Sequence, residues 1–301
     1  MGKLNSIYPY SAIGVAMMPV SPRPYRATSY GLPSAPLSFA QRIETPDGAQ
    51  IATFVYGDLQ PEQAPVLVLH GNGGSHTTFC AVIERLMTAG LAVVAPDARA
   101  QGQSTRGTAP LSYELLAEDA LVVLDHLGIR RAHVLGHSDG GIEALLLARD
   151  HANRVASIVA GGANLTPDGV LDEWDTPSSV AKAQAWVSWM REGDIPNSID
   201  ASLLPQANDI ALDAELLQLM LDQPHIDAAS LGSIKCPACV LVGEHDCITK
   251  EETDAIAHGI PNARLVVVPN VGHSLPRLAP DSVTCEVLTN VLIAQRTSPT
   301  E

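Results

Sequence analysis

A serine between two glycines is the first group in this sequence whose setting suggests chemistry. Residues 136–140 read Gly-His-Ser-Asp-Gly and lie between an apolar run, Ala132 to Leu135, and an amphipathic stretch from Ile142. A G-x-S-x-G turn from a strand into a helix holds its serine in a strained conformation, with Oγ exposed above the sheet. The free N–H groups of the following helix face any negative charge that develops there. The spacing predicts a nucleophile at Ser138.

A second glycine-rich turn, at residues 70–74, follows the apolar run Val66 to Leu69 and reads His-Gly-Asn-Gly-Gly. A phosphate-binding loop is the alternative interpretation. The sequence lacks the lysine of G-x-x-x-x-G-K-[ST] and the full G-x-G-x-x-G spacing, which argues against it. A serine hydroxyl is a weak nucleophile without an adjacent base, so a histidine must complete the site.

These motifs, in this order, make residues 37 to about 296 resemble the α/β-hydrolase family. The resemblance implies that His273, in a loop after the last core strand, is the general base. It implies that Asp246, after the preceding strand, orients that histidine. It further implies that the backbone N–H groups of Asn72 and Asp139 form the oxyanion hole. No metal and no organic cofactor is expected, and activity should fall at acid pH as His273 becomes charged.

Two other carboxylates compete with Asp246 for the third place. Glu244 lies two residues nearer the strand, and Asp168 occupies a region that some relatives use. Among the ten histidines, His70 and His137 lie inside motifs, at positions that the family uses for loop and elbow structure. The others have no comparable placement and are interpreted as surface or packing residues: His76, His126, His133, His151, His225, His245 and His258.

Two positions depart from the family pattern. Relatives usually carry D-x-R-G-x-G-x-S after the strand at Leu91 to Ala95, where this chain has Ala100 in place of the first glycine. The alanine costs on the order of 1 kcal/mol if the position needs a positive φ. Asp139 stands where many relatives have an uncharged residue, and we expect it to cap the helix or tune the pocket. Ser138 is intact, which disfavours dehalogenase and epoxide hydrolase chemistry.

The elements around these motifs predict an α/β fold, a mostly parallel, doubly wound, eight-stranded sheet with a helical cap insertion. A leading hairpin is expected where Leu37 to Thr45 and Gln50 to Tyr56 flank Pro-Asp-Gly. Helices are expected over Tyr113 to Leu127, with Ser112 as N-cap, and over Ile142 to Arg149. Six further runs, nearly continuous in apolar residues, are typical of strands buried on both faces: Val66–Leu69, Leu91–Ala95, Ala132–Leu135, Ala156–Val159, Cys239–Val242 and Leu265–Val268.

The strand pattern stops near Gly162 and resumes near Ile234. We therefore expect three parts: an N-terminal arm over residues 1–36, a hydrolase core over 37–162 and 234–301, and a helical cap over 163–233. Helical spacing within the cap covers Val180 to Arg191 and Ile210 to Leu221.

The cap contains all three tryptophans, Trp174, Trp186 and Trp189. Ligands of open α/β sheets bind at the carboxyl ends of the strands. We expect Trp186, Trp189 and Met190 to line an apolar substrate pocket there. The alternative is that these aromatic residues fill the cap's own core.

Composition limits the partners and the compartment. Eighteen basic and 33 acidic residues give a net charge of -15, which argues against nucleic acid as a partner. Five cysteines, an odd number, indicate a reducing, cytoplasmic setting. Cys236 and Cys239 are interpreted as structural thiols in preference to a redox or zinc pair. No membrane span is expected, and a signal peptide or myristoylation remains an alternative for residues 1–36.

The predicted function is hydrolysis of a small or medium carboxylic ester, thioester or lactone through an acyl-enzyme, with a small-molecule substrate. Perhydrolase, C–C hydrolase and acyltransferase reactions use the same triad and remain alternatives. A hypothesis of another class is a non-catalytic ligand-binding receptor on a hydrolase fold. Sequence leaves the oligomeric state open, a homodimer included.

Overall fold

The computed structural model describes residues 32–171, 176–192 and 207–297. Contacts divide the chain into two units, the smaller of which spans Asp172–Leu221. The smaller unit falls inside the range expected for the cap, whereas residues 163–171 and 222–233 pack with the larger unit. Residues 1–31 of the predicted arm lie outside the described residues, so the role of the arm stays a prediction.

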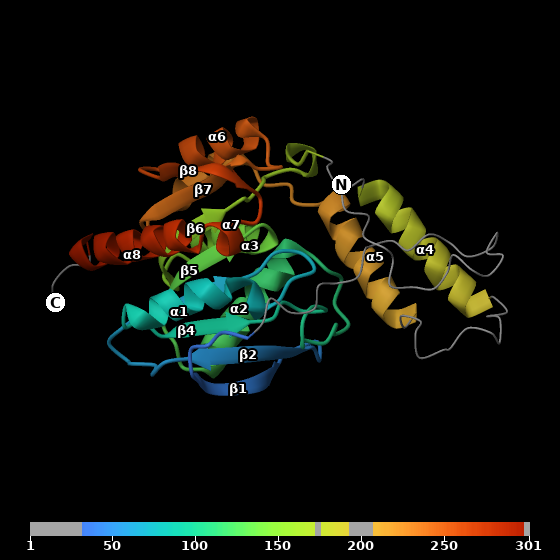
Figure 1. Ribbon diagram of the computed structural model, residues 1–301, viewed down its shortest axis with the longest axis horizontal. Helices are drawn as coiled ribbons and strands as arrows, with labels where there is room; N and C mark the ends of the chain where they lie inside the picture. Colours follow the sequence, from blue (N-terminus) through green and yellow to red (C-terminus); the bar gives the residue numbers. More distant parts are fainter. Residues whose placement is uncertain (1–31, 172–175, 193–206, 298–301) are drawn as a thin grey trace. The chain divides into compact units, whose positions relative to one another are not determined.

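The larger unit is built on an eight-stranded sheet (Figure 1). Its strands are β1 (Leu37–Glu44), β2 (Gln50–Tyr56), β3 (Val66–Leu69), β4 (Val93–Pro96), β5 (Ala132–His137), β6 (Val155–Gly161), β7 (Ala238–His245) and β8 (Arg264–Gly272). They lie in the order β1-β2-β4-β3-β5-β6-β7-β8. β2 is antiparallel to both of its neighbours, and the other pairs are parallel. The predicted fold class is confirmed.

Two of the predicted strands need correction. The run from Leu91 begins as a turn, because the Leu91 N–H donates to the carbonyl of Leu86, and β4 starts only at Val93. The prediction that all six runs are buried on both faces was wrong for β8. Its side chains alternate in burial, and Leu265 and Val267 are 41% and 53% exposed, because β8 is an edge strand.

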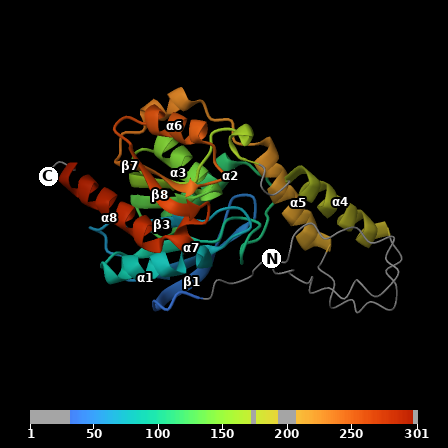
Figure 2. The ribbon, with the colours of Figure 1, turned by 45° about the horizontal axis from the view of Figure 1, so that its top comes forward.

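Helices cover both faces of the sheet (Figure 2). One face carries α1 (Cys80–Thr88), α7 (Leu275–Leu278) and α8 (Pro280–Thr297), and the other carries α2 (Tyr113–His126), α3 (Asp139–Asp150) and α6 (Lys250–Gly259). Short 3-10 turns lie at His76–Phe79, Pro167–Gly169 and Ala228–Ser233. The predicted N-cap of α2 is confirmed, since Ser112 Oγ accepts from the Leu115 N–H at 3.1 Å. α3 begins three residues before the predicted start at Ile142.

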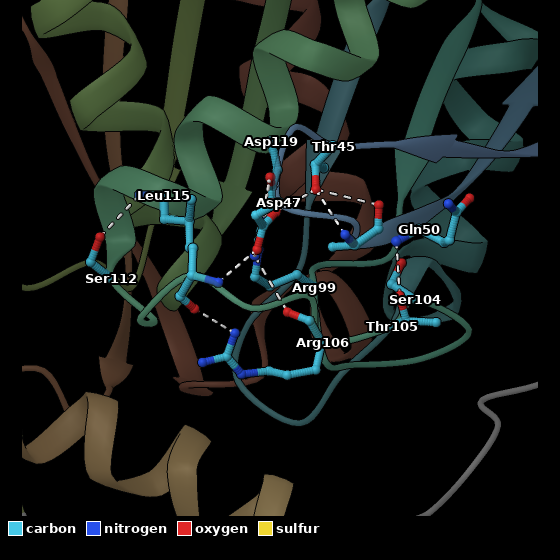
Figure 3. Close-up of polar contacts among 12 residues, drawn as sticks. Thr45, Asp47, Gln50, Arg99, Ser104, Thr105, Arg106, Ser112, Leu115 and Asp119 are labelled. Atoms are coloured by element: carbon cyan, nitrogen blue, oxygen red, sulfur yellow. Dashed lines mark hydrogen bonds and ion pairs between the residues drawn. The ribbon is translucent and has the colours of Figure 1, made fainter.

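The hairpin turn between β1 and β2 is tied to the loop after β4 and to α2 by one buried arginine (Figure 3). The Arg99 side chain is fully buried and makes paired hydrogen bonds to two carboxylates, Asp47 in the turn and Asp119 on α2, at 2.6 to 2.9 Å. The next residue, Ala100, has a φ of 62°. Ala100 therefore occupies a left-handed position that favours glycine, and the alanine costs on the order of 1 kcal/mol there.

The smaller unit contains α4 (Thr176–Glu192) and most of α5 (Ala207–Asp222), which cover the two predicted helices. These helices share an apolar cluster of Ala183, Trp186 and Ile210, with Val187, Trp189, Met190 and Ala214 packed against it. The rings of Trp186 and Trp189 meet edge to face, 5.4 Å apart between centroids. Trp174 lies outside the described residues.

None of the helices in the described ranges has the length and apolar character needed to cross a membrane. All five cysteines carry free thiols. Cys239 is buried in β7, and Cys236 is half-buried just before this strand. Burial raises the pKa of both thiols, to about 11 for Cys236 and about 12 for Cys239, which keeps them protonated at neutral pH.

Candidate active site

Ser138 forms the turn between β5 and α3 and has a left-handed backbone, with φ 57° and ψ -122°. Such a conformation costs a non-glycine residue on the order of 1–3 kcal/mol and persists only where the surroundings enforce it. The flanking glycines enforce it here by allowing close backbone contact. A Cβ on Gly136 would lie 1.8 Å from the Gly140 carbonyl oxygen, and a Cβ on Gly140 would lie 2.1 Å from that of Leu69.

His273 follows β8 and lies between the other two predicted triad residues. Its Nε2 is 2.9 Å from Ser138 Oγ, and its Nδ1 donates to Asp246 at 2.7 Å. Asp246 follows β7, has a side chain only 1% exposed, and also accepts from the N–H groups of Gly243 and Ile248. These bonds fix the carboxylate, which in turn orients the imidazole.

The rival carboxylates make other contacts. Glu244 is exposed and accepts from the Asn270 N–H at 2.7 Å. Asp168 is exposed in the 3-10 turn after β6. Of the three candidates, Asp246 is the one that the fold places against His273.

The loop after β3 lies directly against the serine. A Cβ on Gly71 would come within 2.7 Å of the Ser138 Cβ, so only glycine fits. The Asn72 side-chain amide donates to the Asp139 carboxylate at 3.2 Å, and the Gly73 N–H donates to Gln101 Oε1 at 2.6 Å. The first contact joins the two residues predicted to supply the oxyanion hole, at the start of α3, and the second ties the loop to Gln101 in the loop after β4.

Asp139 is buried at the first residue of α3. Besides the Asn72 amide, it accepts the hydroxyl of the buried Tyr113 at 3.1 Å. One helical turn later, Glu143 is 2% exposed, and its Oε1 has no hydrogen-bond partner among the residues that the structure describes. Burial and the nearby charges of Asp139 and Asp119 raise the pKa of Glu143 well above its ordinary value. These effects favour the protonated, neutral form of Glu143 in the folded protein.

Three effects act on the His273 imidazole. Burial lowers its pKa, but the hydrogen bond to Asp246 and the neighbouring Cys247 side chain outweigh burial and raise the pKa to about 10. Asp246, Cys247 and His273 also form a group of possible metal ligands in the described ranges, with ligand atoms within 4.8 Å of one another. Two of the three are already bonded to each other, and His273 also contacts Ser138.

Comparison with known proteins agrees with this fold. Residues 64–186 match the family described as the alpha/beta hydrolase fold. The chain is 27% identical over 259 residues to a protein of Caulobacter sp. (strain K31) assigned as the carbamate hydrolase RutD, covering 78% of this chain and 92% of that one. The chain has the α/β-hydrolase fold. The prediction of an enzyme is confirmed at the level of a hydrolase of this fold.

Two further proteins match this hydrolase over nearly their whole length. Rhodomycin D methylesterase DnrP of Streptomyces peucetius is 27% identical over 278 residues, which cover 78% of this chain and 92% of that protein. A thermophilic esterase from Thermogutta terrifontis superposes with a TM-score of 0.65 at 26% identity, over 85% of this chain and 99% of the esterase.

The residues predicted for the pocket of this hydrolase belong to the smaller unit. Trp186 is 2% exposed and packs in the cluster between α4 and α5, which favours the alternative that it fills the core of that unit. Trp189 and Met190 are half-buried beside it. A pocket role for these two stays a prediction.

Motif reasoning missed one residue that contacts the candidate base. His137 Nε2 donates to the backbone carbonyl of His273 at 2.6 Å, and the two rings lie 4.9 Å apart. Burial lowers the pKa of His137 to about 4, so the ring is neutral at neutral pH. Its position inside the G-x-S-x-G motif indicated an elbow role and gave no sign of this long-range contact.

Proposed function

We propose that this chain is a serine hydrolase that cleaves a small or medium carboxylic ester, thioester or lactone through Ser138, His273 and Asp246. The observation that carries the proposal is the continuous hydrogen-bonded series at a strained turn. It runs from Ser138 Oγ to His273 Nε2 at 2.9 Å, and from His273 Nδ1 to Asp246 at 2.7 Å. A nucleophile, a base within hydrogen-bond reach and a group that orients the base are the components of nucleophilic acyl transfer.

In the proposed reaction, neutral His273 takes the proton of Ser138 as Oγ attacks the substrate carbonyl carbon. The backbone N–H groups of Asn72 and Asp139 hold the resulting oxyanion, and the dipole of α3 favours negative charge at the same place. His273 then gives its proton to the leaving alcohol, and the carbonyl re-forms as an acyl-Ser138 ester. Water, deprotonated by His273, releases the acid by the same route.

Only neutral His273 can accept the proton of Ser138. The raised pKa of His273, about 10, means that the proportion of the neutral base increases as pH rises above the ordinary imidazole range. The rate of ester hydrolysis should therefore rise with pH through that pKa.

Carbamate hydrolysis is a second candidate, favoured by the likeness to the protein assigned as RutD. A carbamate carbonyl can be attacked by the same serine and released by the same histidine. The likeness to DnrP favours ester cleavage. A perhydrolase, C–C hydrolase or acyltransferase would use the same residues with a different acceptor or leaving group.

A serine-directed phosphonate probe followed by a substrate panel tests the proposal. The panel comprises p-nitrophenyl esters of increasing chain length, a methyl ester, a lactone and a p-nitrophenyl carbamate. Wild type should take up one phosphonate, and Ser138→Ala should lose both labelling and most of the turnover, on the order of 10⁴-fold. Ser233→Ala removes an exposed serine and should leave both unchanged. Turnover that survives in Ser138→Ala would show that another residue is the nucleophile.

The carboxylate is tested in the same assay. Asp246→Asn should lower kcat by on the order of 10³-fold or more, because it disturbs the tautomer and removes the charge that stabilises the imidazolium. Asp168→Asn and Glu244→Gln should stay within a few-fold of wild type. A large loss in either of these variants, with little loss in Asp246→Asn, would transfer the role to the rival residue.

A further inference from the structure

A hollow of about 760 Å³ lies at the amino ends of the parallel strands β3, β5, β6 and β7. Its wall comes from the loop at residues 59–65, the segments that lead into β5, β6 and β7, and the end of α8. The volume falls in the range of small-molecule sites, about 300–1,000 Å³. All of its lining residues belong to the larger unit.

This hollow is separate from the candidate active site. Ser138 follows the carboxyl end of β5, whereas Arg131, which lines the hollow, precedes the amino end of the same strand. A strand of this length spans about 20 Å. None of Ser138, Asp246 and His273 lines the hollow.

The charge of the hollow is opposite to that of the whole protein. Arg130, Arg131 and Lys235 line it, and Glu62 is the one carboxylate among its lining residues. Within the described residues none of the three cations pairs with a carboxylate, whereas Arg85, Arg99, Arg149, Arg154, Lys250 and Arg264 all do. Three unpaired cations at one hollow are a marked concentration in a chain of net charge -15.

The basic segment is held in place by its neighbours. Arg131 donates through Nε and Nη2 to the Val155 carbonyl at 3.0 and 2.9 Å, and Arg154 donates to the carbonyls of Arg130 and Ile129. The Arg131 guanidinium is therefore already positioned, and a positioned charge loses less side-chain entropy when a ligand binds. His133, also in the wall, adds no charge, because burial lowers its pKa to about 4.

Apolar side chains line the same hollow between these cations. They include Leu91, Ile129, Ala156, Val291 and Ala294, from the end of the α1–β4 turn, the β5 and β6 entrances and α8. A ligand that satisfies both parts of the wall needs an anionic head for the arginines and lysine and an apolar body for the rest.

We propose that this hollow is a second binding site, which takes a small organic anion with a carboxylate or phosphate head and an apolar body. The site lies at the amino ends of the parallel strands, whereas Ser138 lies at their carboxyl ends, so the ligand is bound and not consumed. The proposal does not depend on the hydrolase reaction, and it would hold equally if another residue were the nucleophile.

Titration calorimetry on the full chain tests the site with four probes: octyl phosphate, octanoate, inorganic phosphate and octanol, all below micelle-forming concentrations. At least one of the two octyl anions should bind, and it should bind at least about tenfold more tightly than phosphate or octanol, because only the octyl anions contact both parts of the wall. Failure of both octyl anions to bind would overturn the proposal.

Variants then place the bound anion. Arg130→Gln/Arg131→Gln should weaken the octyl anion by about tenfold or more, through loss of charge-assisted hydrogen bonds. Ala152→Trp should weaken it by filling the hollow from an exposed position. The matched control is Arg42→Gln, at an exposed arginine on β1 that does not line the hollow, which should change affinity less than twofold. Unaltered binding in both hollow variants would place the anion elsewhere and overturn the proposal.

Discussion

At the scale of single residues, the surroundings of His273 shift its pKa in opposite directions. Burial favours its neutral form, while Asp246 and Cys247 favour the imidazolium and prevail. Cys247 is buried and directly follows the aspartate, so it approaches the histidine from the same loop. The neutral His137 donates to the carbonyl of His273 and so holds the loop after β8, which carries the histidine. Asp246, Cys247 and His137 thus contact the proposed base, and the first two also raise its pKa.

The role of Cys247 predicts a measurable change in the pH profile. The pKa of His273 is raised, so kcat/KM should increase with pH along a limb that lies above the ordinary imidazole value of 6.5. Cys247→Ala removes one of the raising interactions and should move this limb to lower pH, which increases the rate at pH 7. Cys285→Ala, at an exposed thiol on α8, should leave the limb in place. A limb that is unchanged or moves upward in Cys247→Ala would contradict the role.

Whether a site residue could be predicted depends on how local its signal is. Ser138 is predictable because five consecutive residues encode the turn that exposes it. The contact between His137 and His273 joins residues 136 positions apart, and it forms only because the sheet places the loops after β5 and β8 together. The sequence places Glu143 on a helix, but only the packing of the described residues shows that its Oε1 is buried without a partner among them. No pattern in the sequence predicts the contact of His137 with His273 or the burial of the Glu143 carboxyl group.

At the scale of elements, the strand sequences predicted which strands exist better than where they lie in the sheet. β5 and β8 both contain runs of apolar residues, but β5 has neighbours on both sides and β8 has one. The exposure of Leu265 and Val267 follows from that edge position, which the residues of β8 do not encode. The hairpin was predictable because Asp47-Gly48 carries its own turn signal, and Gly48 does have a φ of 83°.

Arg99 joins three of these elements, and its removal should be costly. Arg99→Leu would leave Asp119 buried without its cation, and loss of one partner from a buried pair costs about 3–5 kcal/mol in free energy of unfolding. Arg99→Lys cannot reproduce the paired bonds to two carboxylates and should also destabilise, by a smaller amount. Urea unfolding measures both changes.

The control for Arg99 is a surface ion pair between helices α1 and α8. Arg85 pairs with Asp281, whose side chain is 85% exposed, so Arg85→Leu should cost less than about 1 kcal/mol. Equal costs for Arg99→Leu and Arg85→Leu would mean that the buried cluster contributes no more to stability than a surface pair.

At the scale of the whole molecule, one carboxyl group of this acidic chain, that of Glu143, is buried in the core. A cavity of about 20 Å³, bordered by His70, Asp97, Arg99, Asp119 and Glu143, lies between α3 and the loop after β4. That volume has room for about one water molecule. Burial and the neighbouring charges of Asp139 and Asp119 raise the pKa of Glu143 and so favour its protonated form in the folded state.

Substitution of Glu143 by glutamine should make the stability of the molecule less dependent on pH. The pKa of Glu143 is raised by folding, so its contribution is fully present below the unfolded value of 4.5 and is lost as pH rises toward the folded value. Glutamine keeps the shape without titrating. The gain in Tm of Glu143→Gln over wild type should therefore grow from pH 5 to pH 8. Glu44→Gln, at an exposed position on β1, should show no such trend. A gain that is constant or shrinks with pH would mean that Glu143 is ionised in the folded protein.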